Sequence, residues 1–70
     1  MTLLTNEEKT TIINQHIKNL EYGKFNAQIS IVEENAKSEP ESETLASLNA
    51  QVADYSSRIT ALEAELDKLV

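Results

Sequence analysis

The last third of the chain carries apolar residues at alternating steps of three and four, without interruption, over four heptads. The residues are Leu45, Leu48, Val52, Tyr55, Ile59, Leu62, Leu66 and Leu69. This spacing is the a/d pattern of a coiled coil, in which one stripe of a helix packs against a second helix. A helix on an ordinary globular core has a wider stripe with a period of 3.6 residues, so the strict repeat favours a coiled coil.

The first half of the chain contains a shorter apolar stripe that fits this ladder as an antiparallel partner. Tyr22, Phe25, Ile29 and Val32 pair in turn with Tyr55, Val52, Leu48 and Leu45, and the residue numbers in each pair add up to 77. A constant sum is expected when two helices fold back on each other across a turn near residues 38–39. The sequence therefore predicts an all-α, antiparallel two-helix hairpin with these eight residues as its intrachain seam.

Local signals define the expected helix ends within a single domain of residues 1–70. Thr5 followed three positions later by Glu8 is a capping-box pattern that should open helix one. Ser38 is a candidate cap for helix two, and Pro40 falls in its first turn, where a missing N–H does no harm. We expect helix one at about residues 6–37, the turn at about 38–39 and helix two at about 39–69.

The constant-sum register fails toward the chain ends. It places Ile59 opposite Lys18 and Leu66 opposite Thr11, which are poor partners. The remaining apolar residues of the first half centre on the other side of helix one. They are Ile12, Ile13, Ile17 and Leu20, with Ala27 and Ile31 continuing the stripe.

Two arrangements account for this second stripe. In the first, Gly23 kinks helix one, and the segment before it rotates to cover residues 59–69. In the second, which we favour, helix one stays straight and its second face packs on another subunit, giving a homodimer or higher bundle of at least four helices. The candidate oligomer interface then consists of Ile13, Ile17, Leu20, Ala27, Ile31, Ile59, Leu62, Leu66 and Leu69.

Composition supports association with a partner. Seventy residues with 40% apolar content make one small domain, and chains of this size usually need a disulfide, a metal or a partner. The chain has no cysteine and one histidine, which leaves oligomerisation as the stabilising device.

The formal charge of −6 is unevenly distributed. Residues 1–37 carry five acidic and four basic side chains, whereas residues 38–70 carry seven acidic and two basic ones. Nucleic acid and anionic membrane surfaces are recognised by clustered Lys and Arg, so neither is an expected partner. The chain lacks an apolar run of spanning length and the charged and apolar blocks of a signal peptide, so a cytoplasmic location is expected.

The sequence offers little chemistry. His16 is the one side chain that titrates near neutral pH, and no Ser, Cys or Asp is placed to form a relay with it. We interpret His16 as an edge residue of an interface, with a pH-sensitive subunit contact as the alternative. Phosphate loops, nucleophile elbows and metal signatures are absent, so no enzymatic activity, cofactor or metal is expected.

An acidic stretch surrounds the predicted turn and comprises Glu33, Glu34, Glu39, Glu41 and Glu43. A calcium loop needs alternating oxygen ligands and a Gly at its bend, whereas this stretch has Pro and no Gly. We interpret these carboxylates as solvated helix ends. The alternative is an acidic tip that docks on a basic partner or mimics nucleic acid.

Two runs of the sequence are KTTIINQH at residues 9–16 and SETLASLNAQ at residues 42–51. They resemble small uncharacterised coiled-coil proteins of marine tailed phages of the cyanophage type. The resemblance implies a phage-encoded protein made in the cytoplasm of a bacterial host. It implies no activity and no functional residue.

The expected function is that of a non-enzymatic structural or interaction protein. In the first hypothesis, an oligomeric coiled-coil hairpin serves as a scaffold, an assembly factor or a small virion component. In the alternative, a regulatory binder captures a host protein through its acidic tip or through the exposed face from Ile13 to Ile31.

Overall fold

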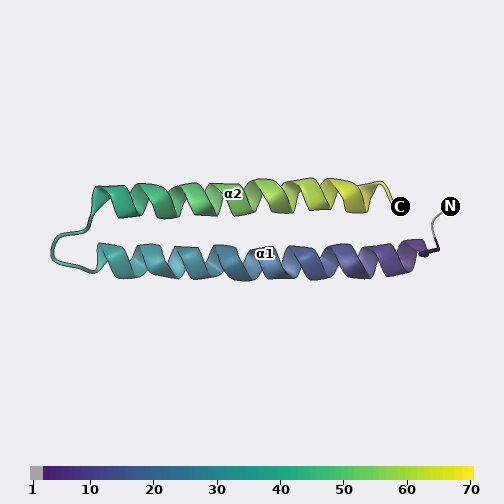
Figure 1. Cartoon of the computed structure of the whole chain (residues 1–70), viewed down its shortest axis with the longest axis horizontal. Helices are drawn as coiled ribbons and strands as arrows, with labels where there is room; N and C mark the ends of the chain where they lie inside the picture. The colour runs from purple at the N-terminus through teal and green to yellow at the C-terminus, as the bar shows by residue number, and fades with distance from the viewer. Residues whose placement is uncertain (1–2) are drawn as a thin grey trace.

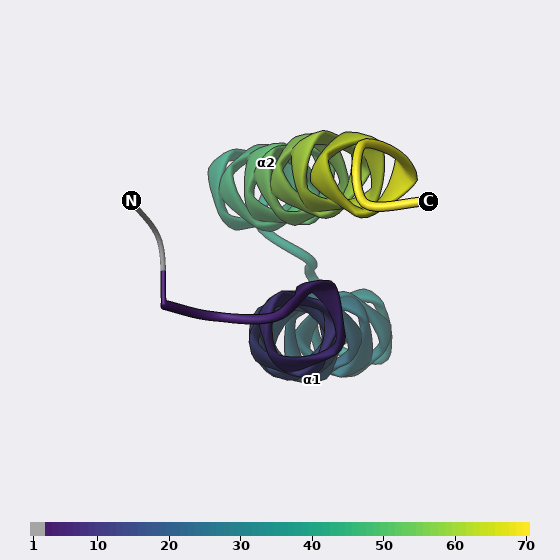
Figure 2. The same ribbon diagram turned by 90° about the vertical axis from the view of Figure 1, so that its right-hand side faces the viewer.

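The computed structural model describes residues 3–70 as two antiparallel α-helices joined by residues 36–41 (Figure 1). Helix α1 spans Asn6–Asn35 and helix α2 spans Ser42–Asp67. The described residues contain no strand, so the predicted all-α hairpin is confirmed. The body measures 56 × 17 × 14 Å, and an end-on view shows the helices as two single layers (Figure 2).

The first turn of α1 forms the capping box that the sequence predicts. The Glu8 backbone N–H donates to Thr5 Oγ1 at 3.1 Å, and the Thr5 N–H donates to Glu8 Oε1 at 3.0 Å. Two N–H groups that have no partner within the helix are satisfied in this way. The Thr5 backbone N–H is also the main reason that the pKa of Glu8 lies below its usual range.

The connection between the helices is longer than predicted. Helix α1 ends at Asn35 and α2 begins at Ser42, so Ser38 and Pro40 lie outside both helices. The predicted Ser38 cap is wrong, because α2 begins only after Pro40. A residue that precedes proline is disfavoured in the helical region, which keeps Glu39 out of the helix. Glu41 is the N-cap residue, and its side chain makes no cap hydrogen bond.

Helix α1 continues through Gly23 without interruption. Gly23 does not adopt positive φ, and the helical assignment covers every residue from Asn6 to Asn35. Helix one is therefore not broken at Gly23. The segment before Gly23 nevertheless lies along the second half of α2, as that alternative expects, since Leu20 shares a groove with Leu62. The straight helix has two apolar faces, and one of them packs against α2.

The core is a single seam between the two helices. Among the described apolar residues only Ala27 and Ile59 are buried, each 6% exposed. A two-layer hairpin has no third element to close over the seam, so most apolar residues of the seam itself are only half-buried. At the open end of the hairpin, the Asn6 side chain donates to the Leu69 carbonyl at 3.3 Å.

Candidate interaction surface

Four large apolar side chains form an exposed line on α1, which we call the outer stripe. It consists of Tyr22, Phe25, Ile29 and Val32, which are 79%, 63%, 42% and 63% exposed. Their spacing of three, four and three keeps the side chains on one face of the helix. The prediction that these residues form the intrachain seam is wrong, because side chains packed against α2 would be largely covered.

The face of α1 that packs against α2 is the face predicted to bind a second subunit. Its apolar members, here called the inner stripe, are half-buried or buried in the single chain: Ile13, Ile17, Leu20, Ala27 and Ile31. The inner stripe runs along most of α1, whereas the outer stripe covers residues 22–32. Pairing the longer stripe with the long ladder of α2 removes more apolar surface from water, which stabilises this arrangement.

The ladder on α2 is used within the chain over its full length. All of its members are half-buried or buried: Leu45, Leu48, Val52, Tyr55, Ile59, Leu62, Leu66 and Leu69. Ile59, which was predicted to need a second subunit, is the most deeply buried of them. That prediction is wrong for the second half of the ladder, because the inner stripe of α1 covers it.

A shallow groove opens in the middle of the outer stripe. Its walls are Tyr22, Phe25, Asn26 and Ile29, and its volume is about 440 Å³. These are positions i, i+3, i+4 and i+7 of one helix. In a coiled coil, four residues with this spacing form the hole that receives a side chain from the facing helix. The groove therefore has the form of a helix-packing site.

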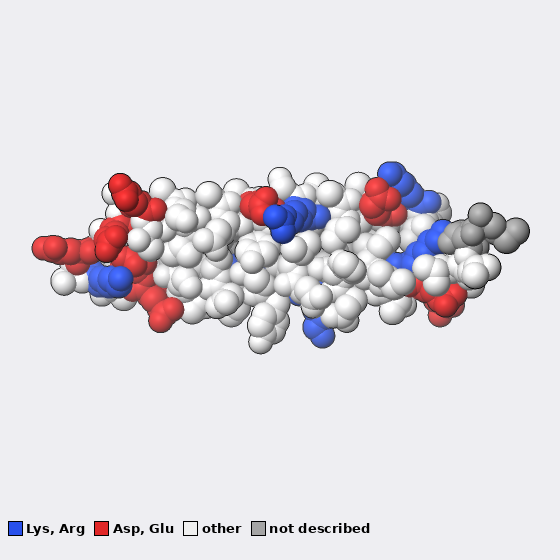
Figure 3. Space-filling view, viewed as in Figure 1, with Lys and Arg blue, Asp and Glu red and all other residues white. Residues whose placement is uncertain are grey.

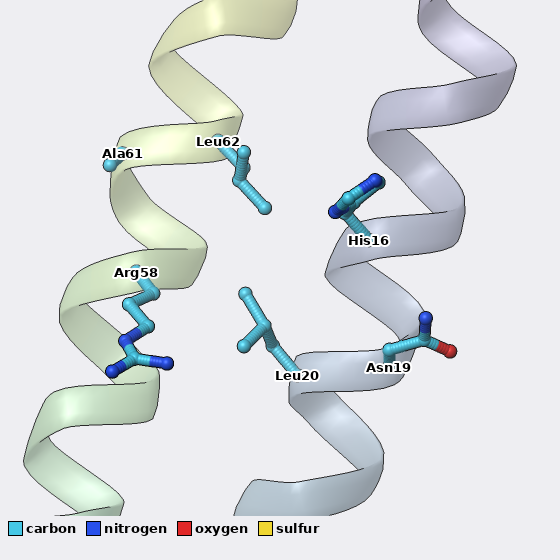
Figure 4. A pocket seen from close by; sticks show the side chains of 6 residues that line it. All are labelled: His16, Asn19, Leu20, Arg58, Ala61 and Leu62. Carbon is cyan, nitrogen blue, oxygen red and sulfur yellow. The ribbon is translucent and has the colours of Figure 1, made fainter.

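A second groove, of about 430 Å³, lies along one side of the seam. It is lined by His16, Asn19, Leu20, Arg58, Ala61 and Leu62. Leu20 and Leu62 point into the space between the helices, and His16 lies beside them on α1 (Figure 4). No hydroxyl, thiol or carboxylate lines the groove with His16, so this groove holds no catalytic relay.

Glu34 closes the turn end of the hairpin. Its carboxylate is buried at 6% exposure, where it accepts the Glu41 backbone N–H at 3.0 Å and pairs with Lys37 Nζ at 3.0 Å. The Glu41 N–H, followed by Lys37, lowers the pKa of Glu34 below its usual range. The hydrogen bond between Lys37 and the Glu34 carboxylate raises the pKa of Lys37 above its usual range. Glu34 therefore ties the end of α1 to the start of α2.

This role of Glu34 differs from the sequence interpretation, which treated every acid near the turn as solvated. A signal was present: Glu34 follows Ile31 by three residues and so continues the line of the inner stripe. Lys37 follows Glu34 by a further three residues, a spacing at which helical side chains meet. Because glutamate is polar, the apolar pattern of the sequence did not assign Glu34 to the face that packs against α2.

The other acidic side chains of the turn stay exposed and gather at one end of the molecule (Figure 3). They are Glu33, Glu39, Glu41 and Glu43. The remaining ion pairs of the described residues, Arg58–Asp54 and Lys68–Glu65, each join residues of the same C-terminal region three or four positions apart. No ion pair of residues 3–70 therefore joins the inner faces of α1 and α2, and apolar packing determines how they meet.

Residues 3–70 contain no group of three His, Cys, Asp or Glu side chains that could hold a metal ion. Neither helix in this part of the chain is long and apolar enough to cross a membrane. Comparison with known proteins gives no match: no family model, no curated protein and no solved structure is significantly similar to the chain.

Proposed function

We propose that this chain is a non-enzymatic structural protein, a helical hairpin that self-associates and serves as a scaffold, an assembly factor or a small virion component. The observation that carries the proposal is the outer stripe: two aromatic and two aliphatic side chains exposed on one face of α1. Isolated apolar residues are common on protein surfaces, whereas a continuous stripe of this kind is typical of an interaction site.

The thin core supports the same proposal. Two helices that bury one stripe each leave only Ala27 and Ile59 as buried apolar residues in the described chain. Small domains with so little buried surface are marginally stable, and association adds free energy that the single chain lacks. Covering the outer stripe also removes from water the largest exposed side chains of the middle of α1.

We propose that the protein acts in the cytoplasm of a bacterial host, because residues 9–16 and 42–51 resemble phage coiled-coil proteins. Self-association would make the hairpin a repeated building block rather than a catalyst. The shallow, open grooves of the described residues suit packing against another helix better than enclosure of a small substrate.

The second candidate is a regulatory binder that captures a basic partner through its acidic turn. Glu33, Glu39, Glu41 and Glu43 are exposed together at one end of the molecule, which favours this candidate (Figure 3). The other binding surface predicted for such a protein, the face of α1 from Ile13 to Ile31, packs against α2.

Sedimentation equilibrium on the wild type and on Phe25→Glu tests the proposal. We expect the wild type to self-associate at micromolar concentrations and Phe25→Glu to sediment as a helical monomer. Ala53→Glu, which places the same charge at an exposed position of α2, is the matched control and should associate like the wild type. A wild type that remains monomeric throughout would overturn self-association and leave the acidic-turn binder.

A further inference from the structure

We propose that the occupant of the outer stripe is a second copy of this chain, packed antiparallel about a twofold axis near residue 27, with Ile29 of one copy seated over Phe25 of the other. The inference rests on the proposed function and adds the partner, the direction and the register. It follows from four properties of the outer stripe: its spacing, its groove, the residues at its ends and its area.

The spacing of the outer stripe is the same in both directions along the chain. Its steps of three, four and three residues reverse into themselves, so an antiparallel copy presents a matching ladder. In this register Tyr22 faces Val32 of the partner subunit, and Phe25 faces Ile29 of the partner subunit. Each large ring therefore meets an aliphatic side chain, and the same patch serves both copies, as a twofold interface requires.

The groove within the outer stripe is compatible with this register. Tyr22, Phe25, Asn26 and Ile29 surround it, so its centre lies close to Phe25. A side chain of a facing antiparallel helix enters such a hole opposite its central residue. In the proposed register that side chain is Ile29 of the partner subunit, and by symmetry Ile29 enters the partner's groove.

The residues that flank the outer stripe favour antiparallel over parallel packing. One step beyond each end of the stripe lie Lys18 and Ala36. A parallel dimer places the two Lys18 ammonium groups against each other and sets the two acidic turns side by side. An antiparallel dimer places Lys18 beside Ala36 of the partner subunit, next to the partner's acidic turn, and separates the two turns. Charge complementarity therefore determines the direction.

The area of the outer stripe is sufficient for a dimer in the weaker range. At the exposed fractions given above, its four side chains offer on the order of 500 Å² per subunit. A standard protein interface buries about 800 Å² per partner. The remainder comes from flanking polar side chains, chiefly Glu21, Asn26, Gln28 and Glu33, which form the rim on both sides of the stripe.

The proposed dimer has a distinctive shape. Residue 27 lies near the turn end of α1, so two antiparallel copies overlap around their turn halves and extend their open ends in opposite directions. The open end lies roughly 36 Å from residue 27 at 1.5 Å per residue, which gives a dimer roughly 70 Å long. A parallel dimer in register keeps the 56 Å length of the single chain.

Cysteine cross-linking tests the register directly, because the chain has no cysteine of its own. Tyr22→Cys and Val32→Cys are prepared separately, oxidised alone and oxidised as a mixture. We expect the mixture to give predominantly the mixed disulfide. Each variant alone should cross-link poorly, because its two copies lie about 15 Å apart in the dimer, beyond the reach of a disulfide. Ala50→Cys, on the exposed face of α2, is the control that should not cross-link with either.

Solution scattering and sedimentation complete the test. We expect a maximum dimension of roughly 70 Å, and a loss of dimer affinity of at least about thirtyfold in Phe25→Glu. Self-disulfides of Tyr22→Cys together with a length near 56 Å indicate a parallel dimer; this result overturns the inference and leaves the self-associating hairpin standing. A monomeric wild type overturns both the inference and the proposed function. A dimer that Phe25→Glu does not weaken overturns the inference, because the two copies then associate through another face.

Discussion

An ideal Cβ atom at Gly23 would lie 2.7 Å from Cζ of Tyr55 and 2.8 Å from the Tyr55 hydroxyl oxygen. The missing side chain at Gly23 therefore provides the space in which the Tyr55 ring approaches α1. A glycine inside a helix costs about 1 kcal/mol relative to alanine, and the contact with Tyr55 gives a physical reason for Gly23 at this position.

Gly23→Ala should destabilise the hairpin by up to about 2 kcal/mol, because displacement of the Tyr55 ring outweighs the gain in helix propensity. In a Tyr55→Leu background the same change should stabilise by about 0.5–1 kcal/mol, since the new methyl group no longer meets a ring. Urea denaturation of the wild type, the two single variants and the double variant measures the coupling. Stabilisation of equal size in both backgrounds would show that Tyr55 moves aside freely and that the contact has no energetic weight.

Ile59→Ala should lower the free energy of unfolding by about 2–4 kcal/mol, because Ile59 is among the few buried apolar residues of the seam. The neighbouring Thr60→Ala, at an exposed position of α2, should change it by less than about 0.5 kcal/mol. Thermal unfolding followed by circular dichroism makes the comparison. An unfolding midpoint that both variants share would contradict the assignment of Ile59 to the seam.

Glu34→Gln should lower the melting temperature at neutral pH, because the variant loses the charged partner of Lys37 and weakens the bond to the Glu41 N–H. The pKa of Glu34 is lowered on folding, so its contribution is present above the ordinary carboxyl pKa of about 4.3 and is lost as pH falls through the folded value. The pKa of Lys37 is raised, so the contribution of Lys37 persists until pH rises through its folded value.

The difference in melting temperature between wild type and Glu34→Gln should therefore be largest near neutral pH and shrink on acidification below about pH 4. Glu33→Gln removes the same charge from an exposed position and serves as the control. We expect a smaller change from Glu33→Gln over the whole pH range. A Glu34→Gln effect that is unchanged in acid would mean that the carboxylate charge does not hold the turn.

Thr5→Ala should cost about 1 kcal/mol and increase fraying of the first turn of α1, because the Glu8 N–H loses its acceptor. Thr5→Ser keeps the oxygen and should behave like the wild type. Amide hydrogen exchange at Glu7 and Glu8 measures the fraying, and thermal unfolding measures the stability. Faster exchange in Thr5→Ser as well as in Thr5→Ala would argue against the hydroxyl as the cause.

The sequence by itself determined the features that depend on local or strictly periodic signals. The heptad ladder of α2, the capping box at Thr5 and Glu8, and the scarcity of Gly and Pro predict two long helices folded back as a hairpin. Each of these signals acts within a few residues or repeats at a fixed interval. The helices, the capping box and the hairpin therefore form regardless of which helix faces pack together.

Only the tertiary structure decided which face of α1 packs against α2. The outer stripe contains the larger side chains, so the sequence pattern favoured the register that pairs the outer stripe with α2. The face of α1 that carries the inner stripe also includes Gly23 and Glu34, which contribute no apolar signal to the sequence pattern. The roles of Gly23 and Glu34 depend on α2, because Gly23 leaves room for the Tyr55 ring and the Glu34 carboxylate accepts the Glu41 N–H.

The physical reason lies in how burial contributes to stability. Apolar burial is summed over the full length of the contact, so the longer inner stripe prevails over the shorter outer stripe even though the outer stripe has larger residues. The total buried apolar area depends on contacts between residues far apart in the sequence. It therefore cannot be read from a local sequence pattern. The same choice leaves Tyr22, Phe25, Ile29 and Val32 exposed, and the proposed function of the hairpin follows from their exposure.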